Sequence, residues 1–370
     1  MAGSASTWNN TGSADGPYPV MLLRLHRANR GPFTEGTHLD EATCKPSHPL
    51  RRMLSAAILC TSFAVPAFAQ FFPLRIVRII VPSPAGSTVD LFARPLAREL
   101  SSIWGQPVLI ENIPGGDYSI GASRVAAAAP DGHTLLMTNH QPVLGNRFLF
   151  KNLPYDPDKS LMPITMAARG GSFLLVHPSI PAKSIRELMA LARGMPGKIA
   201  YASTGRGSAA QLTLEMLGKR EGVGFNHVPY KGPSQALTAL ASGEVSMTTL
   251  TPGASGAMVK SGKVRAIAIT SANRSKLFPN VPSTAESGYP YLTYTFWMGL
   301  FAPAGVSAPI VERIHRDATA IVKRPEFVEK YITSSGLDVV ANSPAEFVEA
   351  ICADVAIVGT MVKAADLRPE

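Results

Sequence analysis

The sequence predicts an α/β protein built as two lobes, and two observations support this prediction. From about residue 75 onward, short apolar runs that are typical of strands alternate with stretches that have helical periodicity, an order that favours largely parallel sheets. About 300 residues follow Gln70, which is large for one hydrophobic core and sufficient for two. The tail beyond Pro309 is rich in helical patterns.

The strand-like and helical segments follow one another regularly along the chain. Strands are predicted over 75–82, 107–111, 133–138, 172–177, 199–203, 224–229 and 264–270. Helices are predicted over 91–103, 120–129, 184–193, 209–219 and 234–241. Pro95 lies inside the first of these helices, where it predicts a kink or a later start.

Residues 50–69 have the three-part layout of a secretory signal peptide. Two arginines precede an uncharged apolar run, and a small-x-small cleavage site ends at Ala69. The apolar run is shorter than the roughly 20 residues that a membrane-spanning helix needs. We therefore expect export, with cleavage near Ala69/Gln70, and we interpret residues 1–49 as a non-native or mis-assigned extension.

The composition after Gln70 argues against several classes of function. This part carries 29 Lys and Arg against 22 Asp and Glu, a net charge of +7, and the charges are scattered. Nucleic-acid binding is therefore not expected, whereas a mild attraction for anionic solutes is. Cys352 is its one cysteine, which excludes an internal disulfide and a cysteine-based metal site. We expect neither a metal nor a cofactor.

Catalytic motifs are also missing from the sequence. It contains no His-Glu-x-x-His, no Gly-x-Ser-x-Gly and no Walker loop. Because catalytic groups can meet in space without a local motif, this observation argues against an enzyme without excluding one.

The first predicted strand runs into a helix through a loop that suits an anion. Ser87 and Asp90 fit a capping box at the start of the helix. Gly86 lets backbone N–H groups approach an anion closely, and a helix N-terminus attracts negative charge. The alternative is an ordinary capped helix with no ligand.

The second strand-to-helix junction contains Gly115 and Gly116, which permit unusual backbone angles. Ser119 is the predicted N-cap of a helix of small residues that can lie close to its neighbours. Packing explains this junction as well as a ligand role does.

At the third junction, Ser208 and Gln211 form another capping box, and Arg206 stands in the loop. Arg206 either grips a carboxylate through two parallel hydrogen bonds or is a solvated loop charge. The loop also matches Gly205-x-Gly207-x-x-Ala, a loose dinucleotide fingerprint, but the ribose-binding acid about 20 residues further on is missing.

Several motifs run in order over nearly the whole chain after Gln70. The most specific is His227-Val-Pro-Tyr-Lys-Gly232, and others lie at 79–90, 111–115, 120–122, 129–136, 153–157, 201–208, 268–275, 281–282 and 302–305. In these motifs the chain is similar to the periplasmic solute-binding receptors of tripartite tricarboxylate transporters, the Bug-type receptors.

The resemblance implies a periplasmic binding protein-like fold of type II, in which two α/β lobes close around a ligand cleft. Lobe 1 would comprise 70–170 and 292–370, and lobe 2 would comprise 171–291. The implied function is to capture a small carboxylate in the periplasm and deliver it to the permease subunits of a membrane transporter, without catalysis. We expect a monomer. An exported hydrolase or oxidoreductase using the same cleft, or a ligand-sensing receptor for a signalling partner, are the alternatives.

The resemblance also places the ligand at loops that include two of these junctions. The residues expected to bind it are Ser83, Ala85, Gly86, Ser87, Thr88, Asp90, Thr138, Asn139, His140, Ser203, Thr204, Gly205, Arg206 and Ser208, together with Trp297, which either lines the cleft or lies in the core. The family often has acids where this chain has Ser246 and Leu250. Because a buried ammonium group needs an acidic partner, we expect an anionic acid rather than an amino acid.

Overall fold

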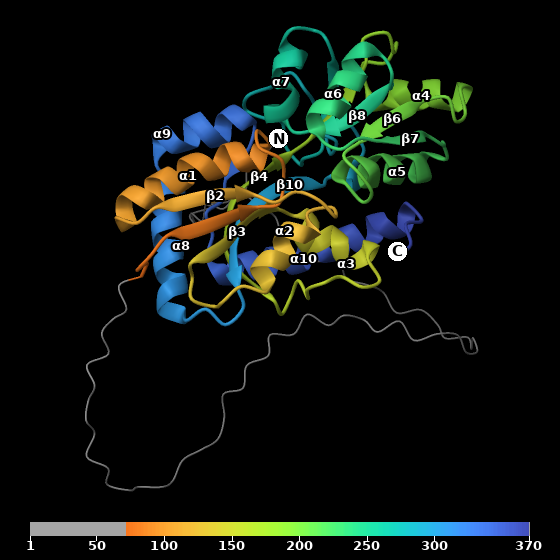
Figure 1. Cartoon of the computed structure of the whole chain (residues 1–370). Helices are drawn as coiled ribbons and strands as arrows, with labels where there is room; N and C mark the ends of the chain where they lie inside the picture. Colours follow the sequence, from red (N-terminus) through yellow and green to blue (C-terminus); the bar gives the residue numbers. More distant parts are fainter. Residues whose placement is uncertain (1–71, 370) are drawn as a thin grey trace, which may run out of the picture. The chain divides into compact units, whose positions relative to one another are not determined.

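The computed structural model describes residues 72–369, whose strands form two sheets with helices packed around them (Figure 1). The predicted signal peptide and the extension before it lie outside the described residues. Among residues 72–369, no helix combines the length and the apolar composition needed to cross a bilayer.

The strands form two mixed sheets. Sheet A has the order β11-β4-β10-β3-β1-β2, and sheet B has the order β7-β6-β8-β5-β9. The strands are β1 (Val77–Val81), β2 (Val108–Asn112), β3 (Thr134–Asn139), β4 (Leu161–Gly171), β5 (Phe173–Val176), β6 (Ala200–Ser203), β7 (Asn226–Pro229), β8 (Met247–Leu250), β9 (Arg265–Ile269), β10 (Thr295–Pro303) and β11 (Asp338–Val339).

Helices follow most of these strands. They are α1 (Thr88–Trp104), α2 (Ser119–Ala126), α3 (Asn146–Leu149), α4 (Ile185–Gly194), α5 (Ala209–Glu221), α6 (Pro233–Ser242), α7 (Pro252–Lys260), α8 (Ala308–Val322), α9 (Pro325–Phe327) and α10 (Pro344–Ala364), with short π or 3-10 turns η1 (Gln141–Gly145), η2 (Pro290–Leu292), η3 (Val328–Ile332) and η4 (Thr333–Ser335). Helix α1 continues through Pro95, which is buried, so the expected late start is not seen.

Sheet B is built from one continuous stretch of chain, whereas sheet A takes its strands from both sides of that stretch (Figure 1). The exact lobe boundaries given above stay a prediction. The expected largely parallel pairing is only partly correct: β1 pairs with β2 and β3 in parallel, and β6 with β7 and β8, but the other pairs are antiparallel. The reason is that β4, β5 and β10 belong to the chain segments that pass from one sheet to the other.

Apolar strand residues explain why these segments form the cores. Val77, Ile79, Ile80 and Val81 of β1 are almost completely buried, as expected for a central strand covered on both faces. Gly121 shows how close the covering helix α2 lies, because a Cβ atom there would meet the Pro82 Cβ at 2.7 Å.

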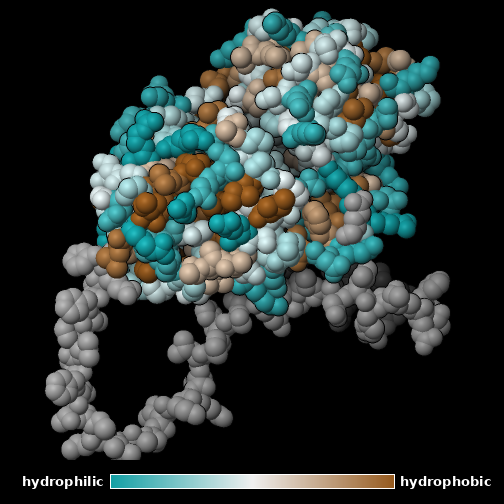
Figure 2. All heavy atoms as spheres, viewed as in Figure 1, coloured by the Kyte–Doolittle hydropathy of each residue, from teal (hydrophilic) through white to brown (hydrophobic). Residues whose placement is uncertain are grey.

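One face keeps apolar side chains in contact with solvent. Figure 2 shows them gathered over α1 and β2, which carry the exposed Leu91, Ile103 and Leu109. The same elements carry charged groups, including Arg94, so this surface is of mixed character.

Candidate functional site

A pocket of about 540 Å³ opens where strands of both sheets end. Its lining residues come from the loops after β1, β2, β3, β6, β7 and β8, together with Ser172 and Phe296 from the connecting segments. Small-molecule sites usually measure about 300–1,000 Å³ and lie at the carboxyl ends of strands in α/β proteins. The pocket therefore has the size and the location of a ligand site.

Five helices begin at this pocket: α1, α2, α5, α6 and α7 contribute residues from their first turn or their N-cap to its wall. The first backbone N–H groups of a helix have no partner within the helix, and the helix dipole adds positive charge at that end. Their convergence makes the pocket favourable for a negatively charged group.

The β1–α1 loop is held by a network of polar contacts. Ser87 accepts a hydrogen bond from the Asp90 backbone N–H at 3.3 Å, and its Oγ lies 2.7 Å from the Oγ of Ser83. The Asp90 carboxylate accepts hydrogen bonds from the Gly86 N–H at 2.8 Å and from the Asn112 side chain at 2.9 Å. The predicted capping box is thus modified, because the acid bonds to the residue before the N-cap.

Asp90 is buried and also pairs with Arg94 at 2.9 Å. Burial raises the pKa of Asp90, but the hydrogen bonds from Arg94, Gly86 and Asn112 lower it by more. The pKa of Asp90 therefore lies below its usual range. The carboxylate is therefore ionised and compensates the N-terminus of α1. It holds the loop and does not line the pocket.

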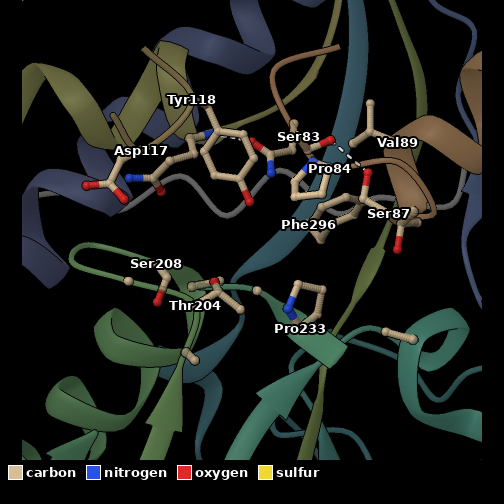
Figure 3. A pocket seen from close by; sticks show the side chains of 18 of the residues that line it. Ser83, Pro84, Ser87, Val89, Asp117, Tyr118, Thr204, Ser208, Pro233 and Phe296 are labelled. Atoms are coloured by element: carbon tan, nitrogen blue, oxygen red, sulfur yellow. Dashed lines mark hydrogen bonds between the residues drawn. The ribbon is translucent and has the colours of Figure 1, made fainter. Parts of the chain in front are cut away.

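The β2–α2 loop has an unusual backbone. Gly115, Gly116, Asp117 and Tyr118 all have positive φ angles, and for Asp117 (φ 48°) and Tyr118 (φ 71°) this is a strained region. Asn146 donates a hydrogen bond to the Asp117 carbonyl at 2.8 Å and holds the loop in place. The predicted N-cap is corrected: Tyr118 occupies that position and the helix begins at Ser119. The loop aims the Tyr118 ring into the pocket (Figure 3).

His140 follows β3 and forms part of the pocket wall, although it is almost completely buried. Burial and the positive charge of Arg169 lower the pKa of His140 to about 3, so its ring is neutral at physiological pH. Its Nδ1 lies 3.1 Å from the Tyr294 hydroxyl, and its Nε2 has no hydrogen-bond partner among the described residues.

On the side of sheet B, the β6–α5 loop is organised by two capping contacts. Ser208 accepts a hydrogen bond from the Gln211 N–H at 3.4 Å, and the Gln211 side chain accepts one from the Gly207 N–H at 2.6 Å. Ser203 is turned away from the pocket, because its Oγ lies 2.6 Å from the His227 Nε2 and also donates to the Gly205 carbonyl.

The structure brings some of the predicted ligand residues to the pocket wall and leaves others behind it. The wall contains Ser83, Ser87, Thr88, Asn139, His140, Thr204, Gly205 and Ser208. Figure 3 shows Ser83 and Ser87 facing Thr204 and Ser208 across the pocket. The wall does not contain Ala85, Gly86, Asp90, Thr138, Ser203, Arg206 or Trp297. That any of these residues binds the ligand stays a prediction.

Arg206 and Trp297 lie outside the wall because other parts of the chain bind their polar groups. Arg206 donates hydrogen bonds to the backbone carbonyls of Leu149 and Arg368, so its guanidinium group is directed toward the C-terminal part of the chain. Trp297 is fully buried, and its Nε1–H donates to Asp354 at 2.9 Å. The core position of Trp297 follows from its place on β10, between β3 and β4.

Sequence reasoning missed several lining groups. They are Pro82, Pro84, Val89, Pro114 to Tyr118, Gln141, Ser172, Ala209, Ala210, Tyr230 to Pro233, Thr249 to Thr251, Ala254 and Phe296. Those that follow β7 or β8 could have been predicted by applying to every junction the rule that ligands bind after parallel strands. The junction after β2 was left open between packing and a ligand role, and the structure places it in the wall. Among residues 72–369, no group of three or more His, Cys, Asp or Glu side chains is placed to hold a metal ion.

Comparison with known proteins identifies the family. The model of the tripartite tricarboxylate transporter family receptor matches residues 92–367. The chain belongs to this receptor family. The expected resemblance to the Bug-type receptors is confirmed, since BugT of Bordetella pertussis is 32% identical over 294 residues, covering 79% of this chain and 90% of BugT. A Cupriavidus necator protein of the UPF0065 group is 38% identical over 269 residues, covering 72% of this chain and 81% of that protein.

Solved structures of related receptors confirm the periplasmic binding protein-like fold. The structure of R. palustris Rpa4515 with adipate has a TM-score of 0.76 at 30% identity and covers 81% of this chain and 100% of that one. MatC of Rhodopseudomonas palustris with bound malate has a TM-score of 0.72 at 29% identity and covers 79% and 100%. The periplasmic binding protein BugD gives a TM-score of 0.73 at 29% identity, with 81% and 100% covered. The family to which the chain belongs consists of receptors, in agreement with the resemblance described above.

Proposed function

We propose that this receptor captures a small carboxylate in the periplasm and delivers it to the permease subunits of a tripartite tricarboxylate-type transporter. The observation that carries the proposal is the convergence of five helix N-termini from both sheets on one pocket. Aligned N–H groups and helix dipoles stabilise a carboxylate without an arginine. No arginine of residues 72–369 lines this pocket. The adipate and malate carried by related receptors support the same class of ligand.

In this proposal the protein is a binding protein without catalysis, and two lobes close over the ligand. The lobes are 70–170 with 292–370, and 171–291, and the lining residues Ser83, Ser87, Thr88, Asn139, His140, Thr204, Gly205 and Ser208 contact the ligand. A ligand that binds both lobes favours the closed arrangement, which the permease would recognise. We propose a monomer that is exported and cleaved near Ala69/Gln70.

Thermal-shift measurements on the processed protein test this function directly. A ligand that binds only the folded state raises the melting temperature, by an amount that grows with concentration above Kd. We expect at least one small carboxylate from a panel to raise it, with isothermal titration giving one site per chain. If no acid shifts the melting temperature while a compound is turned over, the protein is an exported enzyme instead.

A further inference from the structure

The pocket wall carries little formal charge. Asp117 and Lys231 are its two lining residues that are charged at neutral pH, and their charges are opposite. His140 is neutral, because burial lowers its pKa to about 3. A ligand in this pocket therefore meets partial charges from helix N-termini rather than a cluster of cations.

Three of the five helix N-termini already have compensating groups. Asp90 lies in the first turn of α1, Asp117 precedes α2, and α5 is capped by Ser208 with Gln211 in support. Among the described residues, α2, α6 and α7 all begin without a hydrogen bond from a capping side chain, but α6 and α7 also have no acidic residue in the first turn or just before the N-cap. Each N-terminus acts as roughly half a positive charge, so these two together balance about one carboxylate.

Thr249 is a second feature of the pocket wall, independent of the helix N-termini, that indicates a ligand. It is the third residue of β8, shortly before α7, and it lines the pocket. The residue is only 4% exposed, and its Oγ1 is buried with no hydrogen-bond partner among the described residues. A buried hydroxyl without a partner is unfavourable, and a carboxylate oxygen would satisfy it.

The rest of the wall is largely apolar. Figure 3 shows Tyr118, Pro84, Val89 and Phe296 along one side of the pocket and Pro233 opposite. The strained backbone at Tyr118 keeps its ring in this position. Such a surface stabilises an apolar body by excluding it from water. The positive charge of Lys231 is offset by the negative charge of Asp117, so the wall has no net positive charge from side chains to balance a second carboxylate.

We propose that the ligand is a monocarboxylate with an apolar body, its carboxylate held by Thr249 and the starts of α6 and α7, its body between Tyr118, Phe296 and Pro233. This inference rests on the proposed function and narrows it. Acids with two or three carboxylates would have to bury charges that this wall does not balance.

Matched pairs of ligands test the inference on the unmodified protein. Isothermal titration would compare hexanoate with adipate, which has the same six-carbon chain and a second carboxylate, and benzoate with terephthalate. We expect the monoacid of each pair to bind at least tenfold more tightly. Tighter binding of the diacids, or of citrate, would overturn the inference and leave the carboxylate receptor intact. If no acid binds at all, the proposed function fails as well.

The position of the apolar body has its own test. Phe296→Ala should weaken hexanoate binding about tenfold, because it removes much of the apolar wall, and should change acetate binding less than twofold. The melting temperature of the free variant reports whether it is folded. An equal loss for both acids, or no loss for hexanoate in a folded variant, would contradict this placement.

Discussion

The β1–α1 loop and the starts of α6 and α7 face the same pocket but are built differently. In the loop, Ser83, Ser87, Asp90 and Asn112 satisfy one another through hydrogen bonds, so the site is organised before a ligand arrives. At α6 and α7 the helices lack side-chain caps, and the nearby Thr249 hydroxyl has no partner in the described chain. The comparison suggests that one side positions the ligand and the other side gains its missing hydrogen bonds from it.

The largest expected effect comes from breaking the organised side. Asp90→Ala removes the acceptor that joins Gly86, Arg94 and Asn112. The Gly86 N–H loses its partner, whereas Arg94 and Asn112 each keep one other acceptor. We expect a loss of about 3 kcal/mol in the free energy of unfolding, measured by urea denaturation. The exposed Asp338→Ala is the matched control and should cost less than about 0.5 kcal/mol. Equal stabilities of the two variants would show that the network does not organise the loop.

A second prediction concerns His140, which belongs to the side of sheet A but not to that network. Its pKa is about 3 in the folded protein against about 6.5 when unfolded, so between these values the unfolded state binds more protons. This contribution to stability is present above pH 6.5 and is lost as the pH falls. It amounts to about 2 kcal/mol between pH 7 and pH 5.

The measurement for His140 is the pH dependence of urea denaturation. His140→Gln lacks the titrating ring, so the difference in unfolding free energy between the natural protein and this variant should shrink by that amount from pH 7 to pH 5. Tyr294, whose hydroxyl lies 3.1 Å from the His140 Nδ1, has a pKa raised by burial and does not titrate in this range. A constant difference across the range would show that the ring is not held neutral.

Thr249→Val tests the side of the pocket that contains the starts of α6 and α7 and the Thr249 hydroxyl. The change keeps the shape of the side chain and removes a hydroxyl that has no partner in the described structure, so stability should not fall. The proposed carboxylate contact would be lost, and we expect five- to tenfold weaker binding of hexanoate by titration calorimetry, about 1 kcal/mol.

Thr248→Val is the matched control for this change, because the Thr248 hydroxyl donates to the Ala202 carbonyl at 2.8 Å and does not line the pocket. It should lower the unfolding free energy by about 1 kcal/mol and leave affinity unchanged. If Thr249→Val lowered the stability and Thr248→Val weakened binding instead, the Thr249 hydroxyl would not be the group that waits for a ligand.

Much of the architecture was predictable because strands, helices and caps leave local signals. The alternation of buried strands such as β1 with capped helices such as α1 was read correctly, and so was the family. The pocket was harder, because its wall depends on how the two connecting segments bring separate junctions together. Local patterns cannot show that Tyr118 turns inward or that Trp297 is covered by α10, since both follow from strain or packing between distant parts.

Arg206 shows this limit most clearly and gives the smallest expected effect. In the sequence it stands beside a helix N-terminus, where it either grips a carboxylate or is a solvated loop charge. In the structure it donates to the carbonyls of Leu149 and Arg368. Arg206→Ala should therefore change hexanoate affinity less than twofold and lower the unfolding free energy by at most about 1 kcal/mol. A tenfold loss of affinity without a loss of stability would instead show that this guanidinium group contacts the ligand.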